Sequence, residues 1–326
     1  METPNLADRD IDVLVVGGAL ADIVAQGRRL PGPGEAVLGK KGLELNGGKG
    51  VNQAVGAARL GATAALVGAV GEDPRGDRIL VGLAAEGVDV GHVVRLVDLE
   101  TGVSLICVDD DGQKQIMTVP GASAHASRDV VEDARELFPR ARVVLVNLEL
   151  PDEAVYAAIA LAQRAGATVV VDPAPVRSIP REVMRFVDVI RPNAREAAVL
   201  TGVEVTDVHS AREAAHALME QGAGSAVVAA GDVGNLAVWR DAEQLFPRIP
   251  LRALDVTGAG DAFCAALSVA LAEEAKLEES CRFATAAAAL ATTVLGAQHG
   301  LPRREDVVAL LESWAPDRGP PVSASP

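Results

Sequence analysis

The stretch Leu254-Asp-Val-Thr-Gly-Ala-Gly-Asp-Ala-Phe263 places two glycines and two aspartates directly before a helical pattern of apolar residues. Small residues at a helix start let a ligand approach backbone N–H groups that have no partner within the helix, and the helix dipole favours a negative ligand. We therefore predict an anion-binding helix N-terminus with the carboxylate of Asp261 in its first turn. The alternative is that Asp261 only complements the helix dipole.

Short runs of Val, Ile and Leu recur along the rest of the chain, each followed by a segment with helical spacing and a glycine. Nearly continuous apolar runs are typical of parallel strands whose two faces are both covered by helices. The clearest predicted strands are 13–16, 143–146, 168–171, 187–190 and 226–228, and the clearest predicted helices are 152–165 and 210–221, each followed by a glycine. This alternation predicts a doubly wound α/β fold with a mostly parallel sheet flanked by helices.

Two segments do not fit this strand–helix–strand rhythm. Residues 34–46 are extended and rich in glycine, and residues 101–120 predict two strands, 103–108 and 114–119, joined by the turn Asp109-Asp-Asp-Gly112. We expect these segments to form a small β-sheet that covers a site as a lid; a surface hairpin without a function is the alternative. The Pro- and Ser-rich residues 317–326 are predicted to be disordered, which leaves 10–316 as the folded domain.

Composition excludes several classes of protein. With 49% hydrophobic and 23% charged residues among 326, the chain predicts a globular protein with a sizeable core. A net charge of −15, from 30 basic and 45 acidic residues, argues against nucleic acid as a partner but leaves a small anionic ligand possible. The three separated cysteines, the polar start METPNLADRD and the absence of a long apolar run lead us to expect a cytoplasmic protein without a membrane partner.

The Leu254–Phe263 stretch resembles the C-terminal signature D-T-x-G-A-G-D of the PfkB carbohydrate kinase family, in particular its ribokinase branch. Asn46-Gly-Gly-Lys-Gly-Val-Asn-Gln-Ala54 matches the N-terminal signature G-G-K-G-x-N-Q-A of the same family. Other landmarks follow in the family's order, at Asp22, 31–35, 148–149, 172–175, 192–196 and 296–298. The resemblance extends over about residues 13–314, nearly the whole chain.

The resemblance implies a ribokinase-like fold and an ATP-dependent kinase that phosphorylates a pentose, most simply D-ribose to D-ribose 5-phosphate. Asp261 would be the general base, and the backbone of Gly258, Ala259 and Gly260 would form the anion hole. The implied sugar-binding residues, whose polar groups and glycines suit a polyol, are Leu20, Asp22, Gly48, Lys49, Asn52 and Glu149.

The resemblance also implies sites for a nucleotide and two metal ions. Nucleotide contacts are expected from Asn193, Ala229, Gly231, Gly234, Gly260 and Thr285. Asn193-Ala-Arg-Glu196 resembles the family's N-x-x-E motif, in which Glu196 would help to organise Mg²⁺; taken alone, this stretch also predicts a helix cap. A K⁺ site is implied at Asp255, Thr257, Ala291, Val294, Gly296 and Gly300.

Two positions depart from the family's pattern. Ala229 stands where the family often has Thr, so one hydroxyl contact to the nucleotide is absent. Leu20 stands where ribokinases usually have Asn, and it cannot hydrogen-bond a sugar hydroxyl. Either Leu20 faces the pocket and shifts the preference toward 2-deoxyribose, or it packs inward.

Several functions remain open at this level. The alternatives are a 2-deoxyribokinase, another sugar or nucleoside kinase of the family, and a non-catalytic sugar sensor. An exposed edge on the predicted lid also suggests a homodimer that pairs through the lids.

Overall fold

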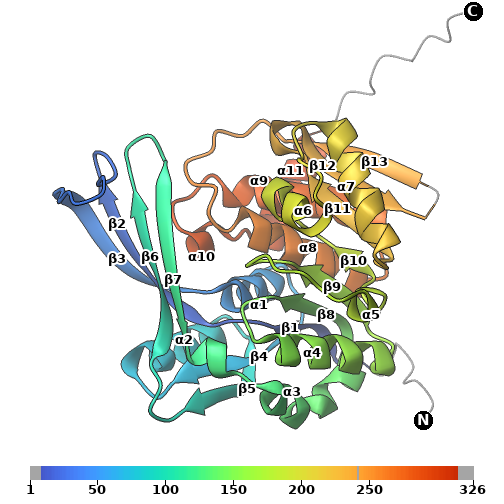
Figure 1. Ribbon diagram of the computed structural model, residues 1–326, viewed down its shortest axis with the longest axis horizontal. Helices are drawn as coiled ribbons and strands as arrows, with labels where there is room; N and C mark the ends of the chain where they lie inside the picture. Colours follow the sequence, from blue (N-terminus) through green and yellow to red (C-terminus); the bar gives the residue numbers. More distant parts are fainter. Residues whose placement is uncertain (1–8, 241, 315–326) are drawn as a thin grey trace, which may run out of the picture.

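A nine-stranded sheet runs through the centre of the protein (Figure 1). The computed structural model describes residues 9–240 and 242–314. The strand order is β13-β12-β11-β10-β9-β8-β1-β4-β5, and all neighbours are parallel except β11–β12 and β12–β13. The strands are β1 (Ile11–Val16), β4 (Ala64–Gly71), β5 (Asp89–Leu96), β8 (Ala141–Asn147), β9 (Thr168–Asp172), β10 (Val189–Ile190), β11 (Ser225–Ala229), β12 (Gly234–Trp239) and β13 (Ala242–Pro247). The predicted doubly wound, mostly parallel α/β fold is confirmed.

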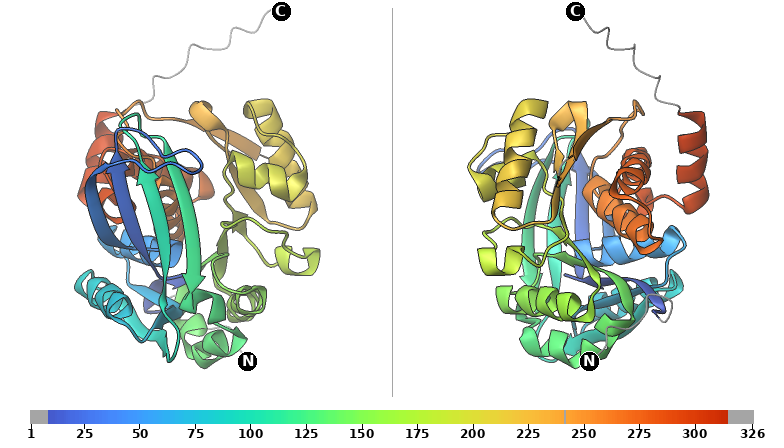
Figure 2. Two further views of the ribbon diagram at one scale, coloured as in Figure 1. Left: turned by 60° about the vertical axis from the view of Figure 1, so that its left-hand side comes forward. Right: turned by 90° about the vertical axis from the view of Figure 1, so that its right-hand side faces the viewer.

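Helices cover both faces of this sheet, as two views of the molecule show (Figure 2). Strand β1 illustrates why: Val13 and Val15 belong to one buried cluster, and Leu14 and Val16 to the other. The first cluster includes side chains of α1 (Lys49–Arg59), α2 (Pro74–Ala85), α8 (Ala259–Ala272), α9 (Leu277–Ala291) and α11 (Arg304–Ser313). The second includes side chains of α3 (Arg128–Asp133), α4 (Asp152–Ala165), α5 (Arg181–Met184), α6 (Ala194–Thr201) and α7 (Val208–Glu220).

Local signals explain where the predicted elements begin and end. Helix α4 has the predicted bounds, and it stops at Gly166, which adopts a left-handed conformation with φ of 67°. Helix α7 starts two residues earlier than predicted because Asp207 caps it by accepting a hydrogen bond from the Ser210 amide. The predicted strand 187–190 is only Val189–Ile190, since the Val187 amide still donates to the carbonyl of Met184, the last residue of α5.

A second, four-stranded sheet stands beside the main body, with the order β3-β2-β6-β7 (Figure 1). We call it the lid sheet; it consists of β2 (Leu20–Gly27), β3 (Gly39–Gly47), β6 (Thr101–Val108) and β7 (Lys114–Gly121). Strands β2 and β6 are parallel, and the other two pairs are antiparallel. The predicted segments 34–46 and 101–120 overlap β3, β6 and β7, but β2 was not foreseen. It follows β1 after three residues and yet pairs in a different sheet, which no local pattern reveals.

The two faces of the lid sheet differ in character because successive side chains of a strand alternate between faces. Ser104, Ile106, Ile116 and Thr118 line the cavity beneath the sheet. The opposite face carries Leu105, Met117 and Val119, whose exposed fractions are 43%, 67% and 51%. The lid sheet therefore has a mixed inner face and an exposed apolar outer face.

Helix lengths also bear on membrane insertion. Within the part of the chain that the structure describes, no helix combines the length and the apolar character that crossing a membrane requires. The predicted disordered segment 317–326 lies outside the described residues.

Two glycines of the lid sheet offer a matched test of its packing. A methyl group at Gly102 in β6 would overlap the Pro120 carbonyl oxygen and the Leu20 side chain, whereas one at Gly42 in β3 would meet nothing within 4 Å. We expect Gly102→Ala to lower the free energy of unfolding by about 1–3 kcal/mol, as overpacking does. Gly42→Ala should change it by no more than about 0.5 kcal/mol. Equilibrium urea unfolding measures both, and equal losses would contradict this account of the packing.

Candidate active site

The polar residues of the site gather where several parallel strands end. Strands β8 and β9 end at Asn147 and Asp172, which are paired across the sheet. The strand order reverses beside β1, and ligands in open α/β sheets bind in the crevice at such a point. A cavity of about 530 Å³ lies here, between these strand ends and the lid sheet.

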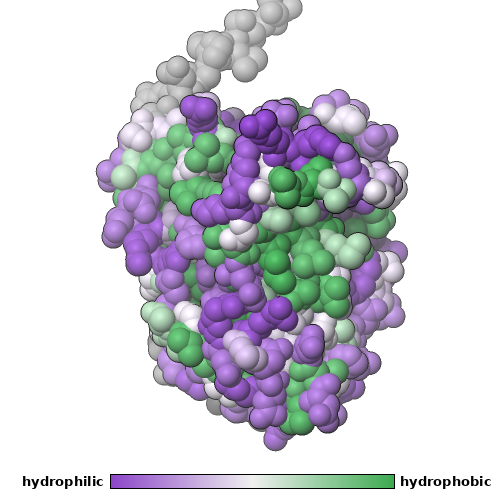
Figure 3. Space-filling model, turned by 90° about the vertical axis from the view of Figure 1, so that its left-hand side faces the viewer, coloured by the Kyte–Doolittle hydropathy of each residue, from purple (hydrophilic) through white to green (hydrophobic). Residues whose placement is uncertain are grey.

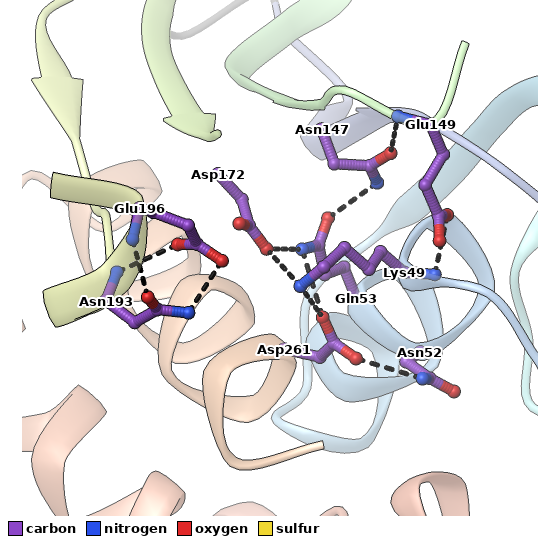
Figure 4. A network of polar contacts seen from close by, with 9 residues as sticks. All are labelled: Lys49, Asn52, Gln53, Asn147, Glu149, Asp172, Asn193, Glu196 and Asp261. Carbon is purple, nitrogen blue, oxygen red and sulfur yellow. Dashed lines mark hydrogen bonds and ion pairs between the residues drawn. The ribbon is translucent and has the colours of Figure 1, made fainter. Parts of the chain in front are cut away.

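Helices α1 and α8 both begin at this cavity, and their first turns face each other (Figure 4). Lys49, Asn52 and Gln53 lie three and four residues apart, so they share one face of α1. Asn52 Nδ2 donates to Asp261 Oδ2 at 2.9 Å, and Lys49 Nζ lies 3.3 Å from Asp261 Oδ1. The two signature stretches at opposite ends of the sequence therefore meet.

A second carboxylate, Asp172, completes this cluster. Lys49 Nζ lies 3.0 Å from Asp172 Oδ2, and Gln53 Nε2 donates to the same oxygen at 2.8 Å. Asn147 Nδ2 in turn donates to Gln53 Oε1 at 3.1 Å, which fixes the orientation of the Gln53 amide. Asn147 and Gln53 are completely buried, and Asp172 and Asp261 are only 3% and 6% exposed. The cluster is thus a buried hydrogen-bond network with one cation between two carboxylates.

Burial and these charges determine the proton affinities in the cluster. Burial raises the pKa of Asp261 above its ordinary value, and the nearby Lys49 offsets only part of that effect. Burial opposes the charge of Lys49, but Asp172 and Asp261 outweigh it and hold the Lys49 pKa well above the usual value. Lys49 therefore stays protonated while Asp261 gains basicity, the property that a proton acceptor needs.

Two further carboxyl groups line the same cavity. Burial, reinforced by repulsion from Asp261, raises the pKa of Asp22 to about 7. Burial raises the pKa of Glu149 to about 8, against the pull of Lys49. Glu149 Oε2 accepts the Lys49 amide at 2.8 Å. The preceding residue, Gly48, has a φ of 86°, which a side chain would strain.

The start of α8 presents backbone amides to the cavity. Its cap residue, Gly258, has a φ of 82°, and no side chain caps the helix. A Cβ atom on Gly258 would also collide with Ala297. Glycine at this position therefore allows the backbone conformation and the close packing against Ala297, and a helix terminus without a side-chain cap attracts an anion.

A second cavity of about 220 Å³ adjoins the first. Arg191 and Val256 line both cavities. Four of the residues predicted to bind nucleotide line the second cavity, namely Ala229, Gly231, Gly234 and Thr285. Ala259 also lines it, whereas Asn193, Gly258 and Gly260 line the larger cavity.

Asn193 and Glu196 form the predicted cap of α6. The Asn193 amide donates to Glu196 Oε2 at 2.8 Å, and the Glu196 amide donates to Asn193 Oδ1 at 2.9 Å. Burial raises the pKa of Glu196. In residues 9–240 and 242–314, no cluster of three or more His, Cys, Asp or Glu side chains is arranged to hold a metal ion. A divalent ion here would therefore depend on substrate oxygens and water, which is how Mg²⁺ commonly binds.

The loops after α9 and before α8 are tied together by Asp255. Its Oδ1 accepts the Thr257 amide and its Oδ2 accepts the Gly296 amide, both at 2.9 Å. The Ala291 carbonyl lies so close to Gly300 that a methyl group there would overlap it. Of the six residues expected to hold K⁺, Val294 is the most peripheral, with 43% of its surface exposed. The Asp255 carboxylate thus joins the two loops through their backbone amides.

Five of the six predicted sugar-binding residues line the larger cavity, namely Asp22, Gly48, Lys49, Asn52 and Glu149. Leu20 is not among its lining residues. Its side chain is 1% exposed and lies against Gly48 and Gly102. Of the two orientations considered for Leu20, the structure has the inward one.

The sequence reasoning assigned no role to several residues of the site. Asp172 and Asn147 each end an apolar strand, and that position was the available signal. Gln53 lay unremarked within the N-terminal signature. Ser104, Thr118, Lys114 and Arg191 also line the larger cavity, and no pattern in the sequence singles them out.

Comparisons with known proteins agree with this geometry. A model of the pfkB family of carbohydrate kinases matches residues 10–304. A ribokinase of Haemophilus influenzae is 35% identical over 298 residues, covering 91% of this chain and 97% of the relative. A deoxyribokinase of Salmonella typhi is 29% identical, covering 90% and 97%. The structure of Arabidopsis thaliana ribokinase complexed with ribose and ATP superposes with a TM-score of 0.85 at 33% identity, covering 93% of this chain and 99% of that one.

The raised pKa of Glu149 predicts a pH-dependent component of stability. Between pH 4.5, its ordinary pKa, and about 8, the folded protein keeps a proton that the unfolded chain has lost, so stability falls as pH rises. Glu149→Gln removes this component. Between pH 5 and pH 9 we expect the free energy of unfolding of Glu149→Gln, measured relative to that of wild type, to rise by on the order of 2–4 kcal/mol. One pKa unit is worth about 1.4 kcal/mol.

Glu86→Gln provides the control, because hydrogen bonding from Arg59 lowers the pKa of Glu86. Removal of the Glu86 carboxylate should lower the free energy of unfolding above pH 4.5. The difference between Glu86→Gln and wild type should then stay constant from pH 5 to 9. Urea unfolding at several pH values measures both variants. A constant difference between Glu149→Gln and wild type across pH 5–9 would contradict the assigned protonation.

Proposed function

The chain belongs to the pfkB family of carbohydrate kinases, and from this membership we propose that it transfers the γ-phosphoryl group of ATP to the primary hydroxyl of D-ribose, giving D-ribose 5-phosphate and ADP. The single observation that carries the proposal is the position of Asp261. Its buried carboxylate stands in the first turn of α8, beside the Lys49 and Asn52 side chains. A proton acceptor therefore adjoins an anion-binding helix start, as phosphoryl transfer to an alcohol requires.

Asp261 would act on the acceptor hydroxyl. As the hydroxyl oxygen attacks the γ-phosphorus, its proton passes to the carboxylate of Asp261, and the bond from phosphorus to the ADP oxygen breaks. The amides of Gly258, Ala259 and Gly260 would stabilise the negative charge on the transferred group. The support is the start of α8, which no side chain caps, although the Ala259 amide also donates to the Val256 carbonyl at 3.3 Å.

The sugar would lie in the larger cavity, beneath the lid sheet. Asp22, Asn52 and Glu149 offer side-chain groups that can hydrogen-bond sugar hydroxyls, and Gly48 lets a sugar approach the backbone. Lys49 donates from its ammonium group. Ile106 and Ile116 of the lid sheet close the cavity with apolar surface, which limits access of water to the reacting groups.

ATP would lie across both cavities, with its base in the smaller one, lined by Ala229 and Thr285. The residues present fit Mg²⁺ that is held mainly by nucleotide oxygens, with Glu196 and Asn193 organising its water ligands. The ion would neutralise charge on the phosphates. A K⁺ ion would bind between the loops that Asp255 joins and would steady the start of α8.

A second candidate is phosphorylation of 2-deoxyribose, supported by the Salmonella typhi deoxyribokinase among the relatives. Because Leu20 packs inward, away from the cavity, this residue gives no preference between the two sugars. A non-catalytic sugar sensor is the third reading, and the retained Asp261–Lys49–Asp172 cluster argues against it.

The cellular location and the oligomeric state complete the proposal. Cys107, Cys264 and Cys281 are all free thiols, which supports the reducing cytoplasm. Hydrophobic residues gather on the face of the molecule that carries the lid sheet (Figure 3), where Leu105, Met117 and Val119 are exposed. An exposed apolar sheet face favours association, so we propose a homodimer in which two lid sheets meet.

Substitution of Asp261 tests the function. Asp261→Asn should lower kcat for ribose phosphorylation by about 10²–10⁴-fold, because the amide cannot accept the hydroxyl proton. Its affinity for ADP should stay within about threefold of wild type. A coupled assay of ADP release with ribose and with 2-deoxyribose measures the rate, and titration calorimetry measures ADP binding.

Asp188→Asn is the control, because Asp188 is another carboxylate with a raised pKa, and it lies outside both cavities. This variant should turn over like wild type. Near-normal turnover in Asp261→Asn would remove the assigned base. No ADP release by wild type with any pentose would favour the sensor.

The dimer proposal predicts that a charge on the outer face of the lid sheet separates the subunits. Met117→Lys should sediment as a monomer at micromolar concentration, because a lysine there would bury its charge in an apolar interface. Val199→Lys, at a residue that is 59% exposed on α6, should sediment as a dimer like wild type. Wild type that sediments only as a monomer would refute the dimer.

A further inference from the structure

Arg191 occupies the boundary between the two cavities. It follows β10 directly, at the carboxyl end of the strand. Among the residues that the structure describes, only Arg191 and Val256 line both cavities, and of these two Arg191 carries the charge. A phosphate chain that links a nucleotide in the smaller cavity to an acceptor in the larger one must pass this boundary.

Neighbouring side chains hold the Arg191 guanidinium in place. Its central carbon lies 4.7 Å from the centre of the Phe263 ring on α8. Nη2 donates to Asn235 Oδ1 on β12 at 3.4 Å. Nη1 lies 3.2 Å from the position of a Cβ atom on Gly260, so the guanidinium also borders the start of α8.

The donors of Arg191 are largely unused. Its Nε is buried without a hydrogen-bond partner, and Arg191 takes part in none of the ion pairs within the described ranges 9–240 and 242–314. The other cations at the cavities already have partners for their charged groups. Lys49 is paired with Asp172 and Asp261, Arg248 is paired with Asp232 at 2.9 Å, and Lys114 Nζ donates to Thr257 Oγ1 at 2.8 Å. Arg191 therefore has charge and N–H groups available for a ligand.

We propose that Arg191 binds the phosphate chain of the nucleotide where it crosses between the cavities, and that it stabilises the charge on the transferred phosphoryl group. The inference rests on the proposed kinase function and adds a residue to it. The guanidinium donates hydrogen bonds to phosphoryl oxygens and forms or breaks no covalent bond. Its planar fork matches two phosphate oxygens, which a lysine ammonium cannot do.

Substitution and chemical rescue test the role. Arg191→Ala should lower kcat by about 10²–10³-fold, the usual effect of losing one donor to a developing charge. The KM for the sugar should change by less than about threefold. Binding of ADP should weaken by at least about tenfold while binding of AMP stays nearly constant, since AMP lacks the phosphates beyond the first. Guanidinium chloride at tens of millimolar should raise the kcat of Arg191→Ala by at least about tenfold. The Arg191→Lys variant should regain only part of the lost kcat.

Arg185→Ala is the matched control. Arg185 also stacks on a phenylalanine, with its guanidinium carbon 4.7 Å from the Phe186 ring centre, but it lines neither cavity. This variant should keep the wild-type kcat and should not respond to guanidinium, and sodium chloride at equal concentration should rescue neither variant.

Two outcomes would overturn the inference. The first is an Arg191→Ala variant with kcat within about threefold of an active wild type. The second is a slow variant that guanidinium does not restore and that binds ADP and AMP as wild type does, which would assign Arg191 a structural role only. If wild type itself releases no ADP with any pentose, the kinase function fails instead, and the comparison of ADP with AMP still tests Arg191.

Discussion

The active site depends on one interaction, the ammonium of Lys49 between the carboxylates of Asp172 and Asp261. These groups come from α1, β9 and α8, so the contact joins both ends of the sequence to the middle of the sheet. Two buried carboxylates without a cation between them would repel each other and lose their hydration, which costs several kcal/mol. Asn52 and Gln53 hydrogen-bond the same carboxylates, so the charges are paired and oriented before any substrate enters.

The lid sheet also helps to position the groups around the cavity. Lys114 of β7 donates from Nζ to Thr257 Oγ1 at 2.8 Å, which links the lid sheet to the loop that leads into α8. Burial is also the main cause of the raised pKa values of Asp22, which lies on β2 of this sheet, and of Glu149. Sugar hydroxyls can replace the water that these carboxyl groups lack, so the site is shaped for a polar ligand that brings its own hydrogen-bonding groups.

Much of this organisation could be predicted from the sequence because its signals are local. Strands buried on both faces are continuous apolar runs, and the signatures around Lys49 and Asp261 are contiguous stretches. What sequence reasoning missed depends on tertiary pairing. Strand β2 follows β1 within three residues but joins the other sheet, and Asp172 becomes part of the site only because β9 lies beside β8. The inward packing of Leu20 likewise depends on Gly102 of a distant strand.

The charge distribution explains how a chain with a net charge of −15 can hold a polyphosphate. Lys49 is outnumbered by its two carboxylates, so this cluster is net negative and would repel the nucleotide if it acted alone. Attraction must come from groups that carry positive potential without a carboxylate partner. The amides at the start of α8 are such groups, and Arg191 stands beside them with its Nε unpaired. Because both lie at the junction of the cavities, the attraction is confined to the place where the phosphoryl group is transferred, and the sugar side keeps the negative charge that a proton acceptor requires.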